Sequence, residues 1–297
     1  MGFFFEVLIA GLLSGVMYSL VALGFVLIYK ASGVFNFAQG SLVFFAALTF
    51  VGLMEHHLSF GVALVVALLV MIAAGLAIER FVLRPLVNQP QISLFMATIG
   101  LSFFIEGLAQ LVWGASVRGL DLGIQDEPIA WISDRTGINI SKFDLMAAGI
   151  AAALVAVLAL FFNRTRIGRA LRAVADDHQA ALAVGIPLQQ IWAIVWAVAG
   201  FVALVTGLLW GARNGVQFAL TFVALKALPV LILGGFESIP GAIVGGLIIG
   251  ATEKLAEVFV GPYFGGGIEG WFPYVLALLF LLVRPEGLFG EKIIRRI

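Results

Sequence analysis

Long apolar runs separated by short polar segments dominate the chain. A helix needs about 20 mostly apolar residues to cross a hydrocarbon core about 30 Å thick, and nine runs reach or approach that length. The runs at 36–53, 217–233 and 271–283 are close to or below the usual minimum of about 17 residues, so we expect some spans to be short, broken or re-entrant. The pattern predicts an all-α polytopic integral membrane protein with about 8–10 transmembrane helices, from the runs 3–28, 36–53, 60–83, 92–113, 144–162, 191–211, 217–233, 241–260 and 271–283.

The composition supports this class and excludes a soluble domain. Hydrophobic residues make up 62% of the chain and charged residues 11%, whereas soluble domains carry about 25% charged residues. The formal net charge is zero, which gives no sign of a nucleic-acid partner. Cysteine is absent, so disulfides, thiol catalysis and cysteine-based metal sites are excluded. The first apolar run is too long, and too poor in N-terminal cations, for a cleaved signal peptide.

The distribution of lysine and arginine predicts the orientation. Alternating nine spans from an outside N-terminus places eleven of these cations on one side of the membrane and four on the other. Cytoplasmic loops carry the excess of cations, so residues 163–190 and the tail from Arg284 are expected in the cytoplasm. Residues 114–143, rich in Gly, Asp, Pro and Asn, are expected outside, as an ordered loop with a hairpin or short helix.

Several kinds of chemistry are missing. There is no G-x-x-x-x-G-K-[ST] loop, so any ATP that drives this chain must be hydrolysed by another subunit. The histidines His56, His57 and His178 lack the i, i+4 spacing of a metalloenzyme helix, and there is no G-x-S-x-G elbow. We expect no catalytic residues, no metal site and no cofactor in this chain.

The polar segment 163–190 carries four arginines and a short helix of its own. Asp176 or Asp177 can cap the N-terminus of that helix, because a carboxylate accepts the unpaired N–H groups there. Gly185 can end it by adopting a positive φ, and Pro187 prevents its continuation. Isolated helices shorter than about 12–15 residues are marginal in water, so the helix Ala180–Val184 needs a surface to dock on.

This segment resembles a known family. Gln179-Ala180-Ala181-x-x-x-Gly185 is similar to the Glu-Ala-Ala-x-x-x-Gly loop of ABC importer permeases. The longer run Gly168–Ile186 closely resembles the version in permeases for branched-chain amino acids, where the loop is the coupling helix that enters a groove of the ATPase. Gln179 replaces the frequent Glu, and the Ile-x-Leu-Pro ending of the general motif is missing. The resemblance implies an ATPase-coupling role for Asp177, Gln179, Ala180, Ala181 and Gly185.

Further stretches resemble the LivH-like branch of the same family, in the family's order. They are Gly11–Gly40, Glu79–Pro85, Leu233–Gly250 and Arg284–Gly290. The resemblance implies one transmembrane permease domain over residues 1–297 in the bacterial inner membrane, with 114–143 as the extracytoplasmic loop and 163–190 as the coupling loop. The implied partners are a second permease subunit (LivM-like, or a second copy of this chain), two ATPase subunits that use ATP and Mg²⁺, and a soluble substrate-binding protein.

Substrates implied by the resemblance are leucine, isoleucine or valine, with other amino acids, urea, short amides and aromatic acids as alternatives. A carrier driven by an ion gradient is a rival class. That class would use Glu106 and Lys226 as an ion relay, but it leaves the capped helix in 163–190 without a role.

Polar residues inside the apolar runs are candidates for the translocation path. A charge at the centre of a span costs about 2.5–3.5 kcal/mol on insertion scales, and Glu106 and Lys226 both lie within spans. They could line the path, form a gate or pair with each other as a structural ion pair. The remaining candidates could equally be interhelical hydrogen-bonding residues; they are Asn36, Gln39, Ser41, Thr98, Ser102 and Gln110.

Glycines near the seventh and eighth spans recur at close-packing spacing. Gly241 and Gly245, and likewise Gly246 and Gly250, are four residues apart. Small residues at i and i+4 let two helices approach closely, so we expect a tight helix crossing here.

Overall fold

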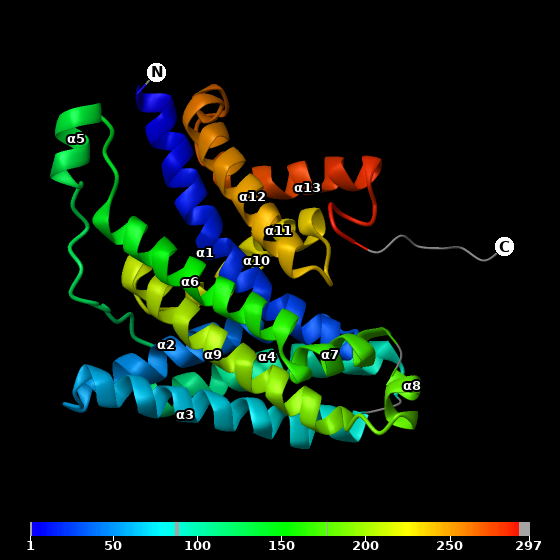
Figure 1. The fold of residues 1–297 in the computed structure, drawn as a ribbon. Coiled ribbons are helices and arrows are strands. Elements are labelled where there is room, and N and C mark those ends of the chain that lie inside the picture. Colours follow the sequence, from blue (N-terminus) through cyan, green and yellow to red (C-terminus); the bar gives the residue numbers. More distant parts are fainter. Residues whose placement is uncertain (1, 87–88, 177, 291–297) are drawn as a thin grey trace. The chain divides into compact units, whose positions relative to one another are not determined.

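The computed structural model describes residues 2–86, 89–176 and 178–290, and within these ranges every regular element is a helix (Figure 1). Isolated β-bridges join Arg118 to Val216 and Pro128 to Ser141. The all-α prediction is therefore confirmed. The chain divides into two compact units: unit 1 is Met1–Leu23, Leu122–Ala156 and Lys226–Ile297, and unit 2 is Gly24–Asp121 and Val157–Leu225.

Unit 2 is built around helix α9. Its elements are the second part of α1 (Gly2–Ser32), α2 (Gln39–Glu55), α3 (Phe60–Ile78), the π-helical turn η1 (Glu79–Leu83), the 3-10 turn η2 (Arg84–Leu86), α4 (Gln91–Trp113), the end of α6 (Lys142–Arg164), α7 (Arg166–Asp176), α8 (His178–Ala183), α9 (Leu188–Asn214), the 3-10 helix η3 (Phe218–Phe222) and most of α10 (Val223–Lys226).

Glycine allows α3 and α9 to lie against each other. A Cβ atom on Gly75 of α3 would lie 2.6 Å from the carbonyl oxygen of Trp196, and one on Gly200 of α9 would lie 2.7 Å from that of Met71. Real Cβ atoms do not approach a carbonyl oxygen so closely. The crossing of α3 and α9 therefore depends on glycine at both positions.

Unit 1 contains the helices of the two chain ends and the middle loop. Its elements are the first part of α1, α5 (Ala130–Thr136), the first part of α6, α11 (Leu228–Gly234), α12 (Ile239–Phe259), the 3-10 turns η4 (Gly261–Phe264) and η5 (Ile268–Gly270), and α13 (Phe272–Val283). α5 is the short helix expected within residues 114–143.

The close packing predicted for the α12 glycines is confirmed. A Cβ on Gly15 of α1 would lie 2.5 Å from the carbonyl oxygen of Gly246, and one on Gly11 would lie 2.7 Å from that of Gly250. A Cβ on Gly245 would lie 2.6 Å from the carbonyl oxygen of Val230. α12 thus packs against α1 through one pair of its glycines and against α11 through another.

The segment after α13 caps the end of α11. The N–H groups of Leu288 and Phe289 donate to the carbonyl oxygens of Leu233 and Gly234, at 2.8 and 3.1 Å. The last carbonyls of a helix have no intrahelical hydrogen-bond partners. At the end of α11 the tail supplies N–H donors to two of these carbonyls. Gly287 has a φ of +80°, and a Cβ there would lie 2.8 Å from the backbone nitrogen of Gly235, so this turn requires glycine.

All nine predicted apolar runs fall on helices, but fewer of them form full-length spans. Within the described residues, five helices are long and apolar enough to cross a membrane, or six if the pair Phe218–Gly234 and Ile239–Phe259, bent by 113°, counts as one broken span. α2 has 17 residues and α13 has 12. The count is lower than about 8–10 because the runs at 36–53, 217–233 and 271–283 are the short or broken ones, as their length indicated.

We predict that Gly75→Ala and Gly200→Ala each destabilise unit 2, because the added methyl group meets a backbone carbonyl that cannot rotate away. Overpacking of this kind costs about 1–3 kcal/mol, and the midpoint of thermal unfolding should fall by roughly 3–10 °C. Fluorescence-detected size exclusion of heated, detergent-solubilised protein measures that midpoint. The matched control is Gly149→Ala on α6, where a Cβ meets nothing within 4 Å. Equal midpoints for all three variants would contradict the packing argument.

Candidate functional site

The break between α1 and α2 places polar groups at the start of α2. The chain turns at Gly33, whose φ is +67°. The side-chain oxygen of Asn36 accepts from the backbone N–H of Ala38 at 3.1 Å, and its amide nitrogen lies 3.4 Å from the side-chain oxygen of Gln39. Asn and Asp favour such turns because their side chains replace a backbone partner. Asn36 and Gln39 are both buried.

Thr98 of α4 connects this break to the next helix. Its hydroxyl oxygen accepts from the backbone N–H of Phe37 at 3.3 Å. The same oxygen lies 2.8 Å from the carbonyl of Phe95 and 3.2 Å from that of Phe35, to either of which the hydroxyl can donate. The irregular backbone of residues 33–38 is therefore hydrogen-bonded by α4, as a break within a membrane requires.

A second polar contact joins the same two helices one turn further on. The hydroxyl of Ser41 lies 2.7 Å from that of Ser102 and 2.7 Å from Oε1 of Glu106, and Ser102 donates to the same oxygen at 3.2 Å. Thr98, Ser102 and Glu106 are spaced by four residues and so share one face of α4. Gln110 continues that spacing and is exposed.

Six of the predicted path residues therefore lie in one polar strip on α2 and α4 of unit 2; they are Asn36, Gln39, Ser41, Thr98, Ser102 and Glu106. One atom of the strip is buried without a hydrogen-bond partner among the described residues, the amide nitrogen of Gln39. A Cβ on Gly24 of α1 would lie 2.5 Å from that nitrogen, so glycine makes room for the Gln39 side chain.

Lys226, the seventh candidate, belongs to unit 1 and pairs there with a residue that the sequence analysis missed. Its Nζ lies 3.1 Å from Oε1 of Glu253 on α12, and the hydroxyl of Tyr18 donates to the same oxygen at 3.1 Å. Glu253 is an acidic residue inside the 241–260 run, so the reasoning applied to Glu106 could have found it. The partner that the structure gives Lys226 is Glu253, not the Glu106 weighed from the sequence.

The predicted coupling segment contains two helices, of which α7 was not predicted. The hydroxyl of Thr165 accepts from the backbone N–H of Gly168 at 3.2 Å, which caps the start of α7. Leu171 and Val174 are buried, whereas Arg166 and Arg169 are exposed. Gly168 lies against the carbonyl oxygen of Phe162, where a side chain cannot fit. α7 therefore turns sharply from α6 and presents arginines to its surroundings.

α8 has the termination that the sequence predicted. Gly185 adopts a φ of +83° and donates to the carbonyl of Leu182 at 3.0 Å, while Ile186 donates to that of Ala181 at 2.9 Å. These two bonds make a Schellman motif, which satisfies the last carbonyls of a helix.

The side chains of α8 divide into a buried and an exposed set. Ala181 is buried, whereas Leu182 is 53% exposed and Val184, just after the helix, is 76% exposed. Ala180 is also exposed. Asp177 and the side chain of Gln179 lie outside the described residues.

A cleft of about 280 Å³ lies beside α8. It is lined on one side by Leu182, Leu188 and Trp192, and on the other by Glu79 and Arg84. The guanidinium of Arg84 binds the Glu79 carboxylate through two hydrogen bonds, of 3.1 and 2.8 Å. Both residues belong to the stretch Glu79–Pro85, one of those whose sequence resembles the LivH-like branch. The pair lies at the end of α3, directly against the segment that joins α8 to α9.

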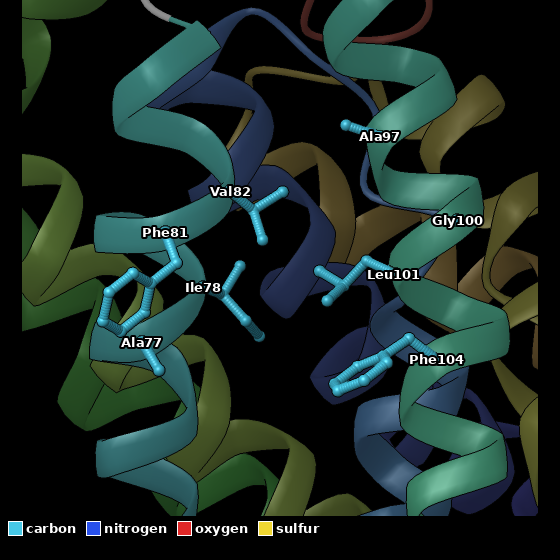
Figure 2. A pocket seen from close by; sticks show the side chains of 8 residues that line it. All are labelled: Ala77, Ile78, Phe81, Val82, Ala97, Gly100, Leu101 and Phe104. Carbon is cyan, nitrogen blue, oxygen red and sulfur yellow. The ribbon is translucent and has the colours of Figure 1, made fainter.

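A groove of about 520 Å³ between η1 and α4 is lined by apolar residues. Figure 2 shows Ile78 and Leu101 pointing toward each other across it. Phe81 and Phe104 line the same groove and are 73% and 64% exposed. No side chain in this lining can hydrogen-bond to a ligand or pair with a charge, so the polar strip is the better candidate for contact with a polar ligand.

Comparison with known proteins identifies the family. The family model "Branched-chain amino acid transport system / permease component" matches residues 7–284. LivH of Salmonella typhimurium, a high-affinity branched-chain amino acid transport system permease protein, is 28% identical over 99% of this chain and 98% of its own length. BraD of Pseudomonas aeruginosa, a permease protein described in the same words, is 30% identical with the same coverage.

One solved structure also aligns with the chain. PsaBC from Streptococcus pneumoniae in complex with Fab aligns over 92% of this chain and 88% of that chain, with a TM-score of 0.49 and 18% identity, which is too distant to carry an argument. The family model and the full-length relatives carry the assignment: this chain belongs to the family of permease components of branched-chain amino acid transport systems.

Proposed function

We propose that this chain is the membrane subunit of an ATP-driven importer for branched-chain or closely related amino acids. The observation that carries the proposal is α8, a short helix ended by its own Schellman motif, with apolar side chains exposed at Leu182 and Val184. Such a helix suits a groove on another protein. The sequence has no phosphate-binding loop, so a separate ATPase must hydrolyse the ATP. That ATPase is the partner we expect to bind α8.

The orientation follows from the excess of cations around α8. Residues 163–190 and the C-terminus lie in the cytoplasm in this proposal, and the N-terminus and residues 114–143 lie outside. Two ATPase subunits, which use ATP and Mg²⁺, dock at Asp177, Gln179, Ala180, Ala181 and Gly185. A second permease subunit completes the membrane part, as a LivM-like partner or a second copy, and a soluble binding protein delivers the substrate from outside. The membrane is the bacterial inner membrane.

The polar strip of unit 2 suits part of the translocation path. A zwitterionic amino acid needs hydrogen-bonding groups for its charged ends, while its branched side chain needs apolar surroundings. The strip supplies hydroxyls, an amide and the carboxylate of Glu106, all within apolar helices. An ionisable residue within the membrane is by default a functional-site hypothesis.

The Glu79–Arg84 pair could transmit motion of α8 to helices α3 and α9. Motion of α8 acts on the cleft that α8 shares with this pair, and the pair ends α3, which packs on α9 through glycine. Packed helices move as rigid bodies between discrete arrangements. Closure of the ATPase pair would thereby shift α3 and α9 together.

The proposal predicts ATP-dependent uptake. The complex of this chain with its permease, ATPase and binding-protein partners should import radiolabelled leucine, isoleucine or valine into proteoliposomes when ATP is present at the ATPase side. An imposed proton or sodium gradient without ATP should drive none. Uptake that follows the ion gradient and ignores ATP would establish the rival carrier class instead.

A second prediction concerns coupling. Val184→Asp puts a charge on the exposed end of α8 without entering the core of unit 2, so the subunit should reach the membrane but retain less ATPase on affinity purification. We expect uptake to fall at least tenfold, equivalent to about 1.4 kcal/mol. Val117→Asp makes the same change at a residue 67% exposed in the segment predicted to lie outside and should leave both properties unchanged. Normal ATPase retention by Val184→Asp would refute the docking role.

A third prediction concerns the path. Glu106→Gln removes a charge that accepts hydrogen bonds from two serines, and such bonds are worth about 1.5–3 kcal/mol. Uptake should fall roughly tenfold while ATPase retention stays normal. The control is Glu127→Gln, since Glu127 forms an exposed ion pair with Lys142 and exposed pairs contribute little. The path assignment fails if both variants transport alike.

A further inference from the structure

Unit 1 contains a second carboxylate site, around Glu253, that the path described above does not use. Oε1 of Glu253 accepts from Nζ of Lys226 and from the hydroxyl of Tyr18, both at 3.1 Å, and Nζ lies 6.0 Å from the centroid of the Tyr18 ring. The three residues come from α10, α12 and α1. Charges within apolar spans are rare because of their desolvation cost, so this cluster requires an explanation.

The hydrogen bonding of the cluster is incomplete. Oε2 of Glu253 is buried and has no hydrogen-bond partner among the described residues. Leaving a buried acceptor unsatisfied costs about 1–3 kcal/mol, and more for a charged group. A carboxylate oxygen in this state can still accept a hydrogen bond, which the donor group of a ligand could supply.

Lys226 is the accessible member of the pair. Its side chain is 35% exposed, against 2% for Glu253. An ammonium group has three N–H donors, and Glu253 accepts one of them. Lys226 ends α10, and Pro229, three residues later in α11, has no backbone N–H to donate to the preceding turn. The lysine thus lies at a helix break, where transporters commonly place substrate sites.

The neighbouring acidic residues of α12 behave differently. Glu257 uses both oxygens, which accept from the backbone N–H groups of Gly267 and Glu269 at 2.8 Å each. Lys254 pairs with Glu269 at 2.9 Å, with side chains 31% and 39% exposed. These groups tie α12 to the loop that follows it, and their carboxylates are not left with a buried free oxygen. Glu253 is therefore not explained by the same structural role.

We propose that Lys226 and Glu253 bind the charged groups of a zwitterionic α-amino acid during transport. The substrate carboxylate takes the N–H donors of Lys226, and the substrate ammonium donates to Glu253. The ion pair carries no net charge and neither does the zwitterion, so the exchange of partners leaves no uncompensated charge in the membrane. This inference rests on the proposed import function and names the substrate groups that this site recognises.

Chemical rescue can test the role of Lys226 because the chain has no cysteine. Lys226→Cys should lower ATP-dependent leucine uptake by the reconstituted complex at least tenfold. Treatment with 2-bromoethylamine converts the new cysteine into a close mimic of lysine and should restore most of the uptake, whereas iodoacetamide, which adds a neutral group, should not. The complex with the unsubstituted chain, treated identically, controls for cysteines of the partner subunits. Full uptake by untreated Lys226→Cys overturns the proposal.

A double variant separates substrate recognition from a merely structural ion pair. Removing both charges of a buried pair is often neutral for stability, whereas removing one is costly. If the pair only holds the helices together, Lys226→Met with Glu253→Gln should transport at the normal rate. If the pair binds substrate, the double variant should keep normal thermal stability and ATPase retention but lose at least tenfold in uptake. Lys254→Met with Glu269→Gln, the neighbouring pair between α12 and η5, should transport normally.

These results are distinguishable from failure of the proposed function. Normal uptake by the double variant overturns the substrate site and leaves the importer intact. Absence of ATP-dependent leucine uptake by the unsubstituted complex overturns the importer, and the substrate site with it.

Discussion

A membrane core supplies no water to a broken helix, so each irregular segment of this chain must find its hydrogen bonds within the protein. Three sets of hydrogen bonds meet that requirement. Asn36 and Thr98 bind the backbone of the break before α2, and the tail at Leu288 and Phe289 caps α11. The polar residues of the spans therefore cluster at breaks for a structural reason first. Three buried side-chain atoms remain without a hydrogen-bond partner among the described residues, on Gln39, Thr206 and Glu253.

The predicted coupling segment, residues 163–190, differs from the breaks within the spans. It lies outside the apolar spans and leaves apolar side chains exposed. α7 keeps Leu171 and Val174 inside unit 2, and its arginines face outward. α8 buries only Ala181 of its described side chains and completes its own C-terminus. A helix of six residues is not stable alone, so its packing on α7 and α9 holds it in shape before any partner arrives. Preorganisation of this kind lowers the entropic cost of docking.

Local signals in the sequence predicted much of this arrangement. Their position inside an apolar run marked Thr98, Ser102 and Glu106 as candidates, and Gly185 with Pro187 predicted where the helix ends. Local sequence signals could not predict which residues contact each other across the fold. Lys226 bonds to a residue 27 positions away, across a bend of 113°, and no periodicity encodes that. Glu253 lies inside an apolar run, as Glu106 does, so the same reasoning could have found it. The runs at 36–53, 217–233 and 271–283 form the short or bent helices, as their length indicated.

The two intramembrane carboxylates differ in a way that matters for transport. Glu106 is bound by two neutral hydroxyls and has no cationic partner among the described residues. Glu253 is already neutralised by Lys226. A zwitterion can bind there only by exchanging one set of ionic contacts for another, so the net free energy of binding is small. A transport path requires this balance, because a site that binds substrate much more strongly than its own partner would retain it. The unsatisfied Oε2 of Glu253 adds one acceptor that the ammonium group of the substrate can use in this exchange.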